Sequence, residues 1–347
     1  PALPVAGSFR SIDFALSSMS NSHIQTVAVL TQYNARSLNE HLSSSKWWNF
    51  GRKQGGLFLF TPTVTADNSD WYRGTADAMY QNIDFLKRRH EPYVIISSGD
   101  CVYKLDFNRV LDFHIEKKSD ITVVCKDMMY NDDVSRFGVV RMDDESRITE
   151  FDEKPIEALS NTISTGIYVI RRRQLIELLE AAAEENRFDF VNDILVRYKN
   201  VKKIYGYKIN SYWNNIADID AYFKTNMDFL RPDVRSYFFR EEPTICSKVD
   251  DLPPAKFNPG SDISNSLVSS GCIINGSVED SVLFKQVFVG KNTTVKNCVI
   301  LNDVYIGDNV HLENCIVESR GTINPNTCYC GEDGVMIVKE KNVRYVI

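Results

Sequence analysis

The C-terminal part of the chain repeats itself at a fixed interval, and this repeat restricts the possible folds more than any other feature. Residues 287–300 (VFVGKNTTVKNCVI) align with residues 304–317 (VYIGDNVHLENCIV) at an offset of 17 residues. Within each copy an apolar residue returns after six positions, as in Val289 and Val295. Six-residue periodicity is typical of a β-helix, in which each coil stacks its inward side chains on the next coil. We expect a β-helix over residues 261–347. A β-sandwich of short strands is the alternative, which the in-register repeat disfavours.

The first two thirds of the chain have a different pattern. Short apolar runs rich in β-branched residues alternate with stretches whose apolar residues recur at three- and four-residue spacing. This alternation predicts an α/β domain with a largely parallel sheet that binds ligands at the carboxyl ends of its strands. We place this domain at residues 1–232 and a proline-rich linker at residues 233–260. The clearest expected elements are the strands Ile24–Leu30, Tyr93–Ser97, Ile121–Cys125 and Thr165–Ile170 and the helices Ala76–Arg89 and Arg173–Glu184.

Composition and charge narrow the functional classes. The 347 residues are 43% hydrophobic with a formal net charge of −6, which argues against a nucleic-acid-binding surface. No apolar stretch approaches the roughly 18 residues that span a bilayer, and no signal peptide is visible, so we expect a cytoplasmic protein without a membrane partner. Because the chain starts at Pro1 and not at a methionine, we also expect its natural beginning to be missing here.

The eight cysteines include no CxxC pair, and most of them lie in apolar runs, so we expect reduced thiols in the core. Cys328 and Cys330 are too close together for an easy disulfide. A zinc site at this pair would need further ligands, which the sequence does not reveal.

A single acidic residue ends a buried strand in the first domain. In the segment SGDCVYKLDF (residues 98–107), Asp100 follows a glycine at the end of an apolar run. Such a carboxylate can hold Mg²⁺ against a substrate phosphate, since Mg²⁺ takes one or two protein carboxylates. A strand-end aspartate can equally cap the next turn, so both roles stay open. A second segment, YWNNIADIDAY (residues 212–222), has the amide Asn215 where a partner carboxylate is expected.

Two further constellations have both a functional and a structural interpretation. Gly74 and Thr75 precede a helical pattern, so the helix N-terminus can offer backbone N–H groups to an anion or a base edge, or Thr75 can simply cap it. Lys154 can bind a sugar phosphate and Glu153 a sugar hydroxyl, or the two can form an exposed ion pair of little energetic weight. In STGIY (residues 164–168), glycine lets the backbone approach a ligand closely.

Taken in order, these motifs resemble those of the bacterial ADP-glucose pyrophosphorylases, also called glucose-1-phosphate adenylyltransferases. The resemblance covers essentially the whole chain. It rests on SGDCVYKLDF, YRGTADAMYQN, FGVV with EFDEKP, STGIY, DFVNDIL, YW with IDAYFKTNMD, and GCIINGSVEDSVLF. It implies an α/β nucleotide-diphospho-sugar transferase (Rossmann-like) domain followed by a left-handed parallel β-helix, usually in a tetramer. It also implies Mg²⁺-dependent synthesis of ADP-glucose and pyrophosphate from ATP and glucose 1-phosphate, in glycogen or starch biosynthesis.

The resemblance also implies roles for single residues. Asp100 matches the catalytic metal-binding aspartate. The other implied roles are glucose 1-phosphate binding for Glu153 and Lys154, substrate-pocket positions for Tyr72, Gly74 and Ser164, and positions tied to allosteric activation for Gln32 and Trp71.

Several positions depart from the pattern of the family. Asn215 replaces the second metal-binding aspartate, and Ala217 replaces the glycine that follows it. Ser8 stands where the family has a lysine, and Val191 and Asn192 replace the glycine and lysine of DFGKDI. The glycine-rich phosphate loop that precedes these motifs in the family is not in this sequence.

These departures predict a poor catalyst. An asparagine keeps the shape of a ligand but removes a full negative charge, and single losses of this kind cost roughly two to three orders of magnitude in rate. The pattern resembles the GlgD type of subunit, which is regulatory and weakly active or inactive. We therefore expect a regulatory subunit in a hetero-tetramer with a catalytic subunit, although self-association and residual binding of ATP and glucose 1-phosphate stay open.

Two alternatives remain. One is a competent adenylyltransferase that tolerates Asn215. The other is a hexapeptide-repeat acyltransferase, which would need a catalytic histidine beside a coil. His311 is the one candidate, and because Thr294 fills its position in the other copy of the repeat, we expect His311 on the outer surface.

Overall fold

The structure, a computed structural model, describes residues 2–33, 35–51, 55–62, 71–129 and 132–341. The chain forms two compact units, each made of separate segments of the sequence. The first unit consists of Pro1–Ser17, Gly99–Lys104 and Tyr212–Ile347, and the second consists of Ser18–Ser98 and Leu105–Ser211. Within the part of the chain that is described, no helix has both the length and the apolar character needed to cross a membrane.

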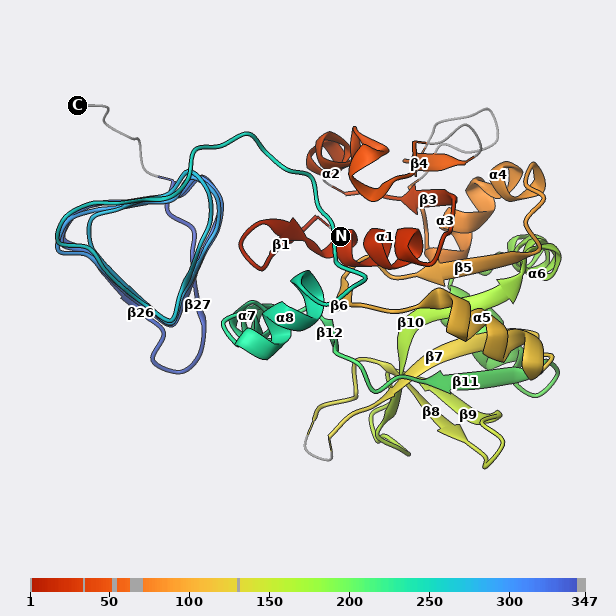
Figure 1. Cartoon of the computed structure of the whole chain (residues 1–347). Helices are drawn as coiled ribbons and strands as arrows, with labels where there is room; N and C mark the ends of the chain where they lie inside the picture. Colours follow the sequence, from red (N-terminus) through yellow and green to blue (C-terminus); the bar gives the residue numbers. More distant parts are fainter. Residues whose placement is uncertain (1, 34, 52–54, 63–70, 130–131, 342–347) are drawn as a thin grey trace. The chain divides into compact units, whose positions relative to one another are not determined.

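A six-stranded mixed sheet is the centre of the second unit (Figure 1). Its strands are β11 (Ile204–Lys208), β7 (Ile121–Asp127), β10 (Thr162–Arg171), β8 (Gly138–Met142), β9 (Ile148–Glu153) and β5 (Tyr93–Ser97). Only β11 pairs in parallel, with β7, whereas β10 is antiparallel to β5, β7 and β8. The expectation of a largely parallel sheet is wrong here. Among the described residues, the connections that lead from β7 through β8 and β9 to β10 contain no crossover helix of the kind that joins neighbouring parallel strands.

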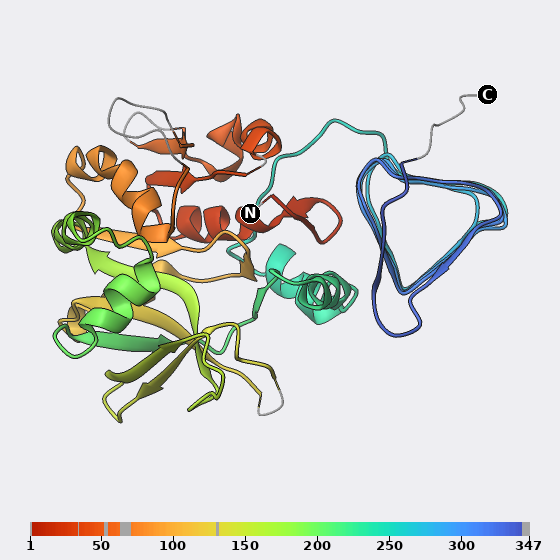
Figure 2. The same ribbon diagram turned by 180° about the vertical axis from the view of Figure 1, so that it is seen from behind.

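Two helices cover opposite faces of this sheet. Helix α5 (Phe107–Glu116) lies in front of it in Figure 1, and helix α6 (Arg172–Glu184) lies in front of it in Figure 2. The side chains of Leu175, Leu178 and Leu179 recur at helical spacing and pack in one buried cluster with apolar residues of β7 and β10.

The remaining elements of the second unit surround this core. They are β3 (Thr26–Leu30), β4 (Gly56–Phe60), α2 (Ala35–Leu42), the 3₁₀-helix η1 (Ser45–Trp48), α3 (Thr75–Gln81), α4 (Ile83–Lys87) and the π-helix η2 (Val191–Val196). Strands β3 and β4 form a parallel pair. The helix expected over Ala76–Arg89 is thus two helices, with a break at Asn82. The Asn82 side-chain amide donates to the carbonyl oxygen of Ala78, a local bond that competes with helix continuation.

The first unit begins with a hairpin of β1 (Pro4–Val5) and β2 (Phe9–Arg10), followed by α1 (Ser11–Asn21), whose residues are divided between the two units. A short antiparallel ladder joins β6 (Cys101–Tyr103) to β12 (Trp213–Asn215). Helices α7 (Ile219–Asp228) and α8 (Pro232–Phe239) follow. Residues 233–239 of the expected linker therefore form part of a helix, and Val234 and Phe238 are buried in the core of this unit.

The tyrosine and asparagine of the IDAYFKTNMD motif hold the N-terminal hairpin in place. The hydroxyl of Tyr222 donates to the carbonyl oxygen of Pro4 at 2.7 Å. The side-chain oxygen of the buried Asn226 accepts from the backbone N–H of Ala6 at 3.0 Å. This part of the motif therefore has a structural role.

The C-terminal part of the first unit is the expected parallel β-helix, with a triangular cross-section (Figure 1). The first side is β13 (Lys256–Phe257), β16 (Ile273–Ile274), β19 (Phe288–Val289), β22 (Tyr305–Ile306) and β25 (Thr322–Ile323). The second is β14 (Asp262–Ser264), β17 (Ser277–Glu279), β20 (Thr294–Lys296), β23 (His311–Glu313) and β26 (Cys328–Cys330). The third is β15 (Leu267–Val268), β18 (Val282–Leu283), β21 (Val299–Ile300), β24 (Cys315–Val317) and β27 (Met336–Val338).

Each coil places its inward apolar residue on that of the next coil. Val295 pairs with Leu312 in the parallel register, and both side chains are fully buried. At one corner, Asn292, Asn309 and Asn326 have φ of 55°, 55° and 60°. Their side-chain amides form a ladder, with N···O distances of 3.3 and 3.0 Å. Asparagine tolerates this left-handed conformation and also bonds to its counterpart in the next coil, which explains its return at each corner.

Candidate functional site

Asp100 and Asn215 lie beside each other at the start of the ladder between β6 and β12. Asn215 is opposite Cys101 in the register, and the backbone N–H of Ile216 donates to the carbonyl oxygen of Asp100 at 3.0 Å. Both side chains are half-buried. The two segments that the sequence analysis paired as a metal site are therefore brought together.

The thiol of Cys101 links the two side chains. Its sulfur lies 3.5 Å from Oδ1 of Asp100 and 3.5 Å from Nδ2 of Asn215. Burial raises the pKa of this thiol well above its usual range, and the Asp100 carboxylate raises it further. The thiol therefore stays protonated and donates to Asp100, while the Asn215 amide donates to the sulfur.

The orientation of Asn215 makes it unsuitable as a ligand for Mg²⁺. Its side-chain oxygen accepts the backbone N–H of Ala217 at 2.9 Å, which fixes the amide nitrogen on the side of Cys101. Mg²⁺ requires oxygen ligands, and here the amide presents its N–H groups to the Cys101 sulfur, which lies next to Asp100. The residues at positions 100 and 215 thus do not fit a two-ligand magnesium site.

Ser8 belongs to the same unit. It lies between β1 and β2, and its hydroxyl is 3.5 Å from the hydroxyl of Ser269 in the β-helix. The hydroxyl of Ser269 in turn donates to the carbonyl oxygen of Gly7 at 2.9 Å. The contact gives Ser8 a partner in the β-helix, and a phosphate-facing role for this position stays a prediction.

In the second unit, the motif around Gly74 packs against Phe188. A Cβ atom at Gly74 would lie 2.4 Å from the carbonyl oxygen of Phe188, so only glycine fits this approach. The guanidinium of Arg73 lies 3.7 Å from the centre of the Phe188 ring. The hydroxyl of Thr75 accepts the backbone N–H of Phe190 at 2.9 Å. Two motifs that are far apart in the sequence therefore hold each other.

This packing corrects one expectation about the N-terminus of α3. The backbone N–H groups of Ala76 and Asp77 both donate to the carbonyl oxygen of Phe188, at 2.8 and 3.2 Å. These donors are satisfied inside the protein and do not serve an anion. The cap residue is Gly74, not Thr75.

The replaced residues Val191 and Asn192 lie in the first turn of η2. Asp193 accepts the backbone N–H groups of Phe188 and Asp189 at 3.0 and 2.9 Å, and Asp189 accepts that of Asn192 at 2.7 Å. Carboxylates thus maintain the shape of this segment without the glycine and lysine of the family pattern.

In the second unit, polar side chains from three segments form a separate candidate site, which we call the Glu153 cluster: Glu153, Ser164, Tyr168 and Asp189. The hydroxyls of Ser164 and Tyr168 lie 3.3 Å apart and both residues are buried. Burial raises the pKa of Glu153, Lys154 opposes this shift, and the nearby charge of Asp189 adds to it. The cluster offers carboxylates and hydroxyls that suit the hydroxyl groups of a sugar.

Local backbone features make room for this cluster. Gly166 has φ of 74°, and the pairing of β10 with β7 shifts register between Ser164 and Tyr168. Gly138 lies opposite Glu153 in the ladder of β8 and β9, and a Cβ there would lie 2.9 Å from the carboxylate oxygen. Lys154 follows with φ of 51°, is exposed, and places its Nζ 3.9 Å from Glu153.

Gln32, Trp71 and Tyr72 form a third group. The side-chain oxygen of Gln32 accepts the backbone N–H of Tyr72 at 2.6 Å. The hydroxyl of Tyr72 accepts from Asn82 at 3.0 Å, and burial raises the pKa of this tyrosine. Trp71 stacks on Tyr33 with ring centres 5.3 Å apart, and both rings are exposed. Gln32, predicted to be regulatory, is thus hydrogen-bonded to Tyr72, predicted to lie in the substrate pocket.

Three residues beside the predicted site residues were not predicted to have a role: Cys101 in the first unit, and Tyr168 and Asp189 in the second. Tyr168 lies in the motif STGIY and Asp189 in the motif DFVNDIL, so their positions in these motifs could have indicated a role. Cys101 gave no signal, because its importance arises from the pairing of two strands that are distant in the sequence.

Comparison with known proteins agrees with this architecture. Residues 1–231 match the family model "Nucleotidyl transferase", and residues 253–338 match "GlmU-like, C-terminal hexapeptide". Proteins called glucose-1-phosphate adenylyltransferase are similar over most of the chain. The one from Geobacillus stearothermophilus is 39% identical over 341 residues, 97% of this chain and 88% of the relative. Those from Clostridium novyi (strain NT) and Bacillus subtilis (strain 168) are 38% and 37% identical over 298 residues, in each case 85% of this chain and 78% of the relative. The chain therefore belongs to the glucose-1-phosphate adenylyltransferase family.

Proposed function

We propose that this chain is a regulatory subunit of ADP-glucose pyrophosphorylase, of the GlgD type, with little or no activity of its own. It would act with a catalytic subunit that makes ADP-glucose and pyrophosphate from ATP and glucose 1-phosphate. The observation that carries the proposal is the orientation of Asn215, which offers its amide nitrogen to the Cys101 sulfur at 3.5 Å and its oxygen to Ala217.

Loss of the second carboxylate matters because phosphoryl transfer depends mainly on positioning and on neutralisation of charge by the metal. One carboxylate, Asp100, remains near the expected metal position. Removal of a single group that stabilises the transition state costs about 100- to 1,000-fold in rate. A second loss, the lysine replaced by Ser8, would lower the rate further.

Other parts of the site support retained ligand binding. The Glu153 cluster keeps its carboxylates and hydroxyls, and burial raises the pKa of Glu153. We propose that Glu153, Lys154 and Ser164 bind the sugar phosphate. The hydrogen bond of 2.6 Å between Gln32 and Tyr72 supports a regulatory position beside the nucleotide site. Such a subunit would sense substrate or effector without turning substrate over.

Three measurements of ADP-glucose formation with Mg²⁺ test the proposal: this chain alone, the catalytic paralogue alone, and the two together. We expect a rate near background for this chain alone and a changed rate or effector response for the mixture. Co-purification of the two chains should accompany the change. Substantial activity of this chain alone would contradict the proposal, as would a mixture that behaves as the sum of its parts.

The competent enzyme remains the second candidate, since the family fold and the Glu153 cluster are retained. It predicts that Asn215→Asp changes the rate little, whereas the regulatory proposal allows a gain. The acyltransferase alternative has less support. His311 lies on the outer side of β23, as expected, with its Nε2 3.5 Å from the Glu313 carboxylate.

A further inference from the structure

Four side chains with metal-binding atoms lie on the outer face of two adjacent strands of the β-helix. Strand β23 carries His311 and Glu313, and strand β26 carries Cys328 and Cys330. In the parallel register, His311 is opposite Cys328 and Glu313 is opposite Cys330. Leu312, between His311 and Glu313, is buried in the core of the β-helix, and Tyr329, between Cys328 and Cys330, packs against that core. Because side chains alternate along a strand, the other four form a two-by-two array on the outside.

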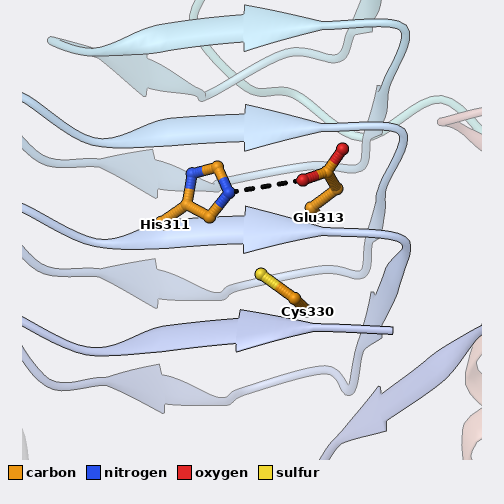
Figure 3. Close-up of side chains that lie close together, drawn as sticks. All are labelled: His311, Glu313 and Cys330. Atoms are coloured by element: carbon orange, nitrogen blue, oxygen red, sulfur yellow. Dashed lines mark ion pairs between the residues drawn. The ribbon is translucent and has the colours of Figure 1, made fainter. Parts of the chain in front are cut away.

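Ligand atoms of His311, Glu313 and Cys330 lie close to one another, and Cys328 is the neighbour of Cys330. Nε2 of His311 lies 3.5 Å from Oε2 of Glu313 (Figure 3). The two sulfur atoms of Cys328 and Cys330 also lie 3.5 Å apart. One ligand atom each from His311, Glu313 and Cys330 lie within 4.8 Å of one another. Around zinc, with bonds of about 2.0–2.3 Å, ligand atoms lie about 3.3–3.8 Å apart, so the side chains, Cys328 above all, have to rotate inward for one ion to bind all four.

The backbone beneath the array is fixed by hydrogen bonds between the coils. The N–H of His311 donates to the carbonyl oxygen of Thr327, and the N–H of Gly331 donates to that of Glu313, both at 3.0 Å. The coil before presents Lys296 above Glu313, but its Nζ is paired with Glu279 at 3.8 Å. Hydrogen bonds between the coils thus hold the backbone that carries the four side chains, and the ammonium group of Lys296 is already paired with Glu279.

The structure shows which cysteines lie outside the core and what lies beside them, which the sequence did not reveal. Among the described residues, Cys101, Cys125, Cys272, Cys298 and Cys315 are buried, as expected. In contrast, Cys328 is exposed and Cys330 is half-buried, and a histidine and a carboxylate lie beside them.

We propose that His311, Glu313, Cys328 and Cys330 together bind one Zn²⁺ ion at the surface of the β-helix. Two thiolates, an imidazole and a carboxylate are ligands typical of zinc, and four protein ligands make a closed, structural site. The ion would link two successive coils near the C-terminal end of the described β-helix. The inference does not depend on the proposed regulatory function, because its four residues belong neither to the Asp100 site nor to the Glu153 cluster.

Binding is expected to release protons. The sulfur atoms of Cys328 and Cys330 lie 3.5 Å apart and share a hydrogen bond, so a thiol proton has to leave when a metal ion binds both. Zinc binds the thiolate and displaces the proton, and its affinity should therefore rise with pH.

The test is a titration of the full chain, reduced and freed of metal by a chelator, with ZnCl₂ in competition with a chromophoric chelator. We expect one zinc ion per chain. CoCl₂ should give the thiolate-to-cobalt absorption of a tetrahedral site. Cys328→Ser and Cys330→Ser should each lower the affinity at least roughly 100-fold, since loss of even an outer-shell partner of a ligand costs about 10- to 100-fold.

Two matched controls separate this site from adventitious binding. Thr294→Ala changes the position opposite His311 in the preceding coil, and Cys246→Ser removes an exposed thiol elsewhere. Both should keep the affinity and the cobalt spectrum. Zinc should raise the melting temperature of the wild type and of both controls but not of Cys330→Ser. A double Cys328→Ser/Cys330→Ser variant that binds zinc as tightly as the wild type would overturn the proposal, and so would a wild type that shows no thiolate-to-cobalt band.

Discussion

Asn215 lies directly opposite Cys101 in the ladder between β6 and β12, with its amide nitrogen 3.5 Å from the Cys101 sulfur. The same sulfur lies 3.5 Å from a carboxylate oxygen of Asp100. A chain of donors therefore runs from the amide through the thiol to the carboxylate. This arrangement gives Asp100 a hydrogen-bond donor, whereas two carboxylates at these positions would repel each other unless a cation lay between them.

The first prediction concerns the substitution Asn215→Asp. It keeps the acceptor for the N–H of Ala217 but replaces the donor to Cys101 by a second negative charge. We expect the unfolding free energy without divalent cations to fall by about 1–3 kcal/mol, because an acceptor then faces the sulfur and a carboxylate. Mg²⁺ should restore the loss, and the melting temperature with and without MgCl₂ measures it. Asn215→Ala is the control, and it should show no Mg²⁺-dependent shift. If the melting temperature of Asn215→Asp were the same with and without Mg²⁺, the restored carboxylate would not form a metal site with Asp100.

The second prediction concerns Gly74→Ala, at the point where α3 approaches Phe188. The added Cβ would lie 2.4 Å from a backbone carbonyl oxygen, which cannot move as easily as a side chain. We expect a loss of about 2–3 kcal/mol in the free energy of unfolding, measured by urea denaturation, as for other overpacked sites. Gly51→Ala is the control, since its nearest contact is a side-chain oxygen at 3.9 Å. Equal stability of the two variants would mean that α3 does not pack on Phe188 as described.

The third prediction is a pH dependence due to His114, which is 1% exposed and bonded to Thr122 through Nδ1 at 2.8 Å. Burial lowers the pKa of His114 to about 4, the charge of Arg171 also lowers it, and Asp120 opposes the shift. In the unfolded chain the pKa is about 6.5. The unfolded state thus binds the proton more tightly, so this stabilisation is complete above pH 6.5 and is lost as the pH falls towards 4.

The variant His114→Gln should not lose this contribution. Between pH 7 and pH 4, we expect the wild type to lose about 2–3 kcal/mol more unfolding free energy than His114→Gln. Urea titrations at both pH values measure the difference. His90→Gln, at an exposed histidine, should follow the wild type. Parallel pH profiles of the wild type and His114→Gln would show that His114 does not titrate in this range.

The sequence predicted some parts of the fold well because the physical constraint is local and periodic. The offset of 17 residues between Thr294 and His311 is the register of adjacent coils in the structure. The same offset relates His311 to Cys328 and Glu313 to Cys330, so the zinc-ligand array was within reach of the repeat pattern. The direction of the strands could not be predicted, because an apolar run has the same sequence pattern whether its neighbour is parallel or antiparallel.

The candidate site was predictable in its composition but not in its connections. Asp100 and Asn215 stood out as unusual positions, yet the link through Cys101 joins residues that are 114 positions apart. The contact of Gly74 with Phe188 has the same character: the glycine suggested a helix N-terminus, and only the fold shows that a carbonyl oxygen occupies it. Motifs reveal which residues matter, whereas their partners depend on long-range packing.

The last prediction tests why asparagine recurs at one corner of the β-helix. Asn309 has φ of 55°, donates to Asn326 at 3.0 Å, and accepts from Asn292 at 3.3 Å. Asn309→Ala loses the ladder bonds and also strains the left-handed backbone, whereas Asn309→Gly loses only the bonds. We expect a loss of about 2–3 kcal/mol for alanine, from about 1–2 kcal/mol for the left-handed backbone and about 1 kcal/mol for the bonds. Glycine should lose only the contribution of the bonds, about 1 kcal/mol, and urea denaturation compares the variants. If alanine were no worse than glycine, the backbone conformation would not be the reason for asparagine at this corner, and the hydrogen-bond ladder would explain it alone.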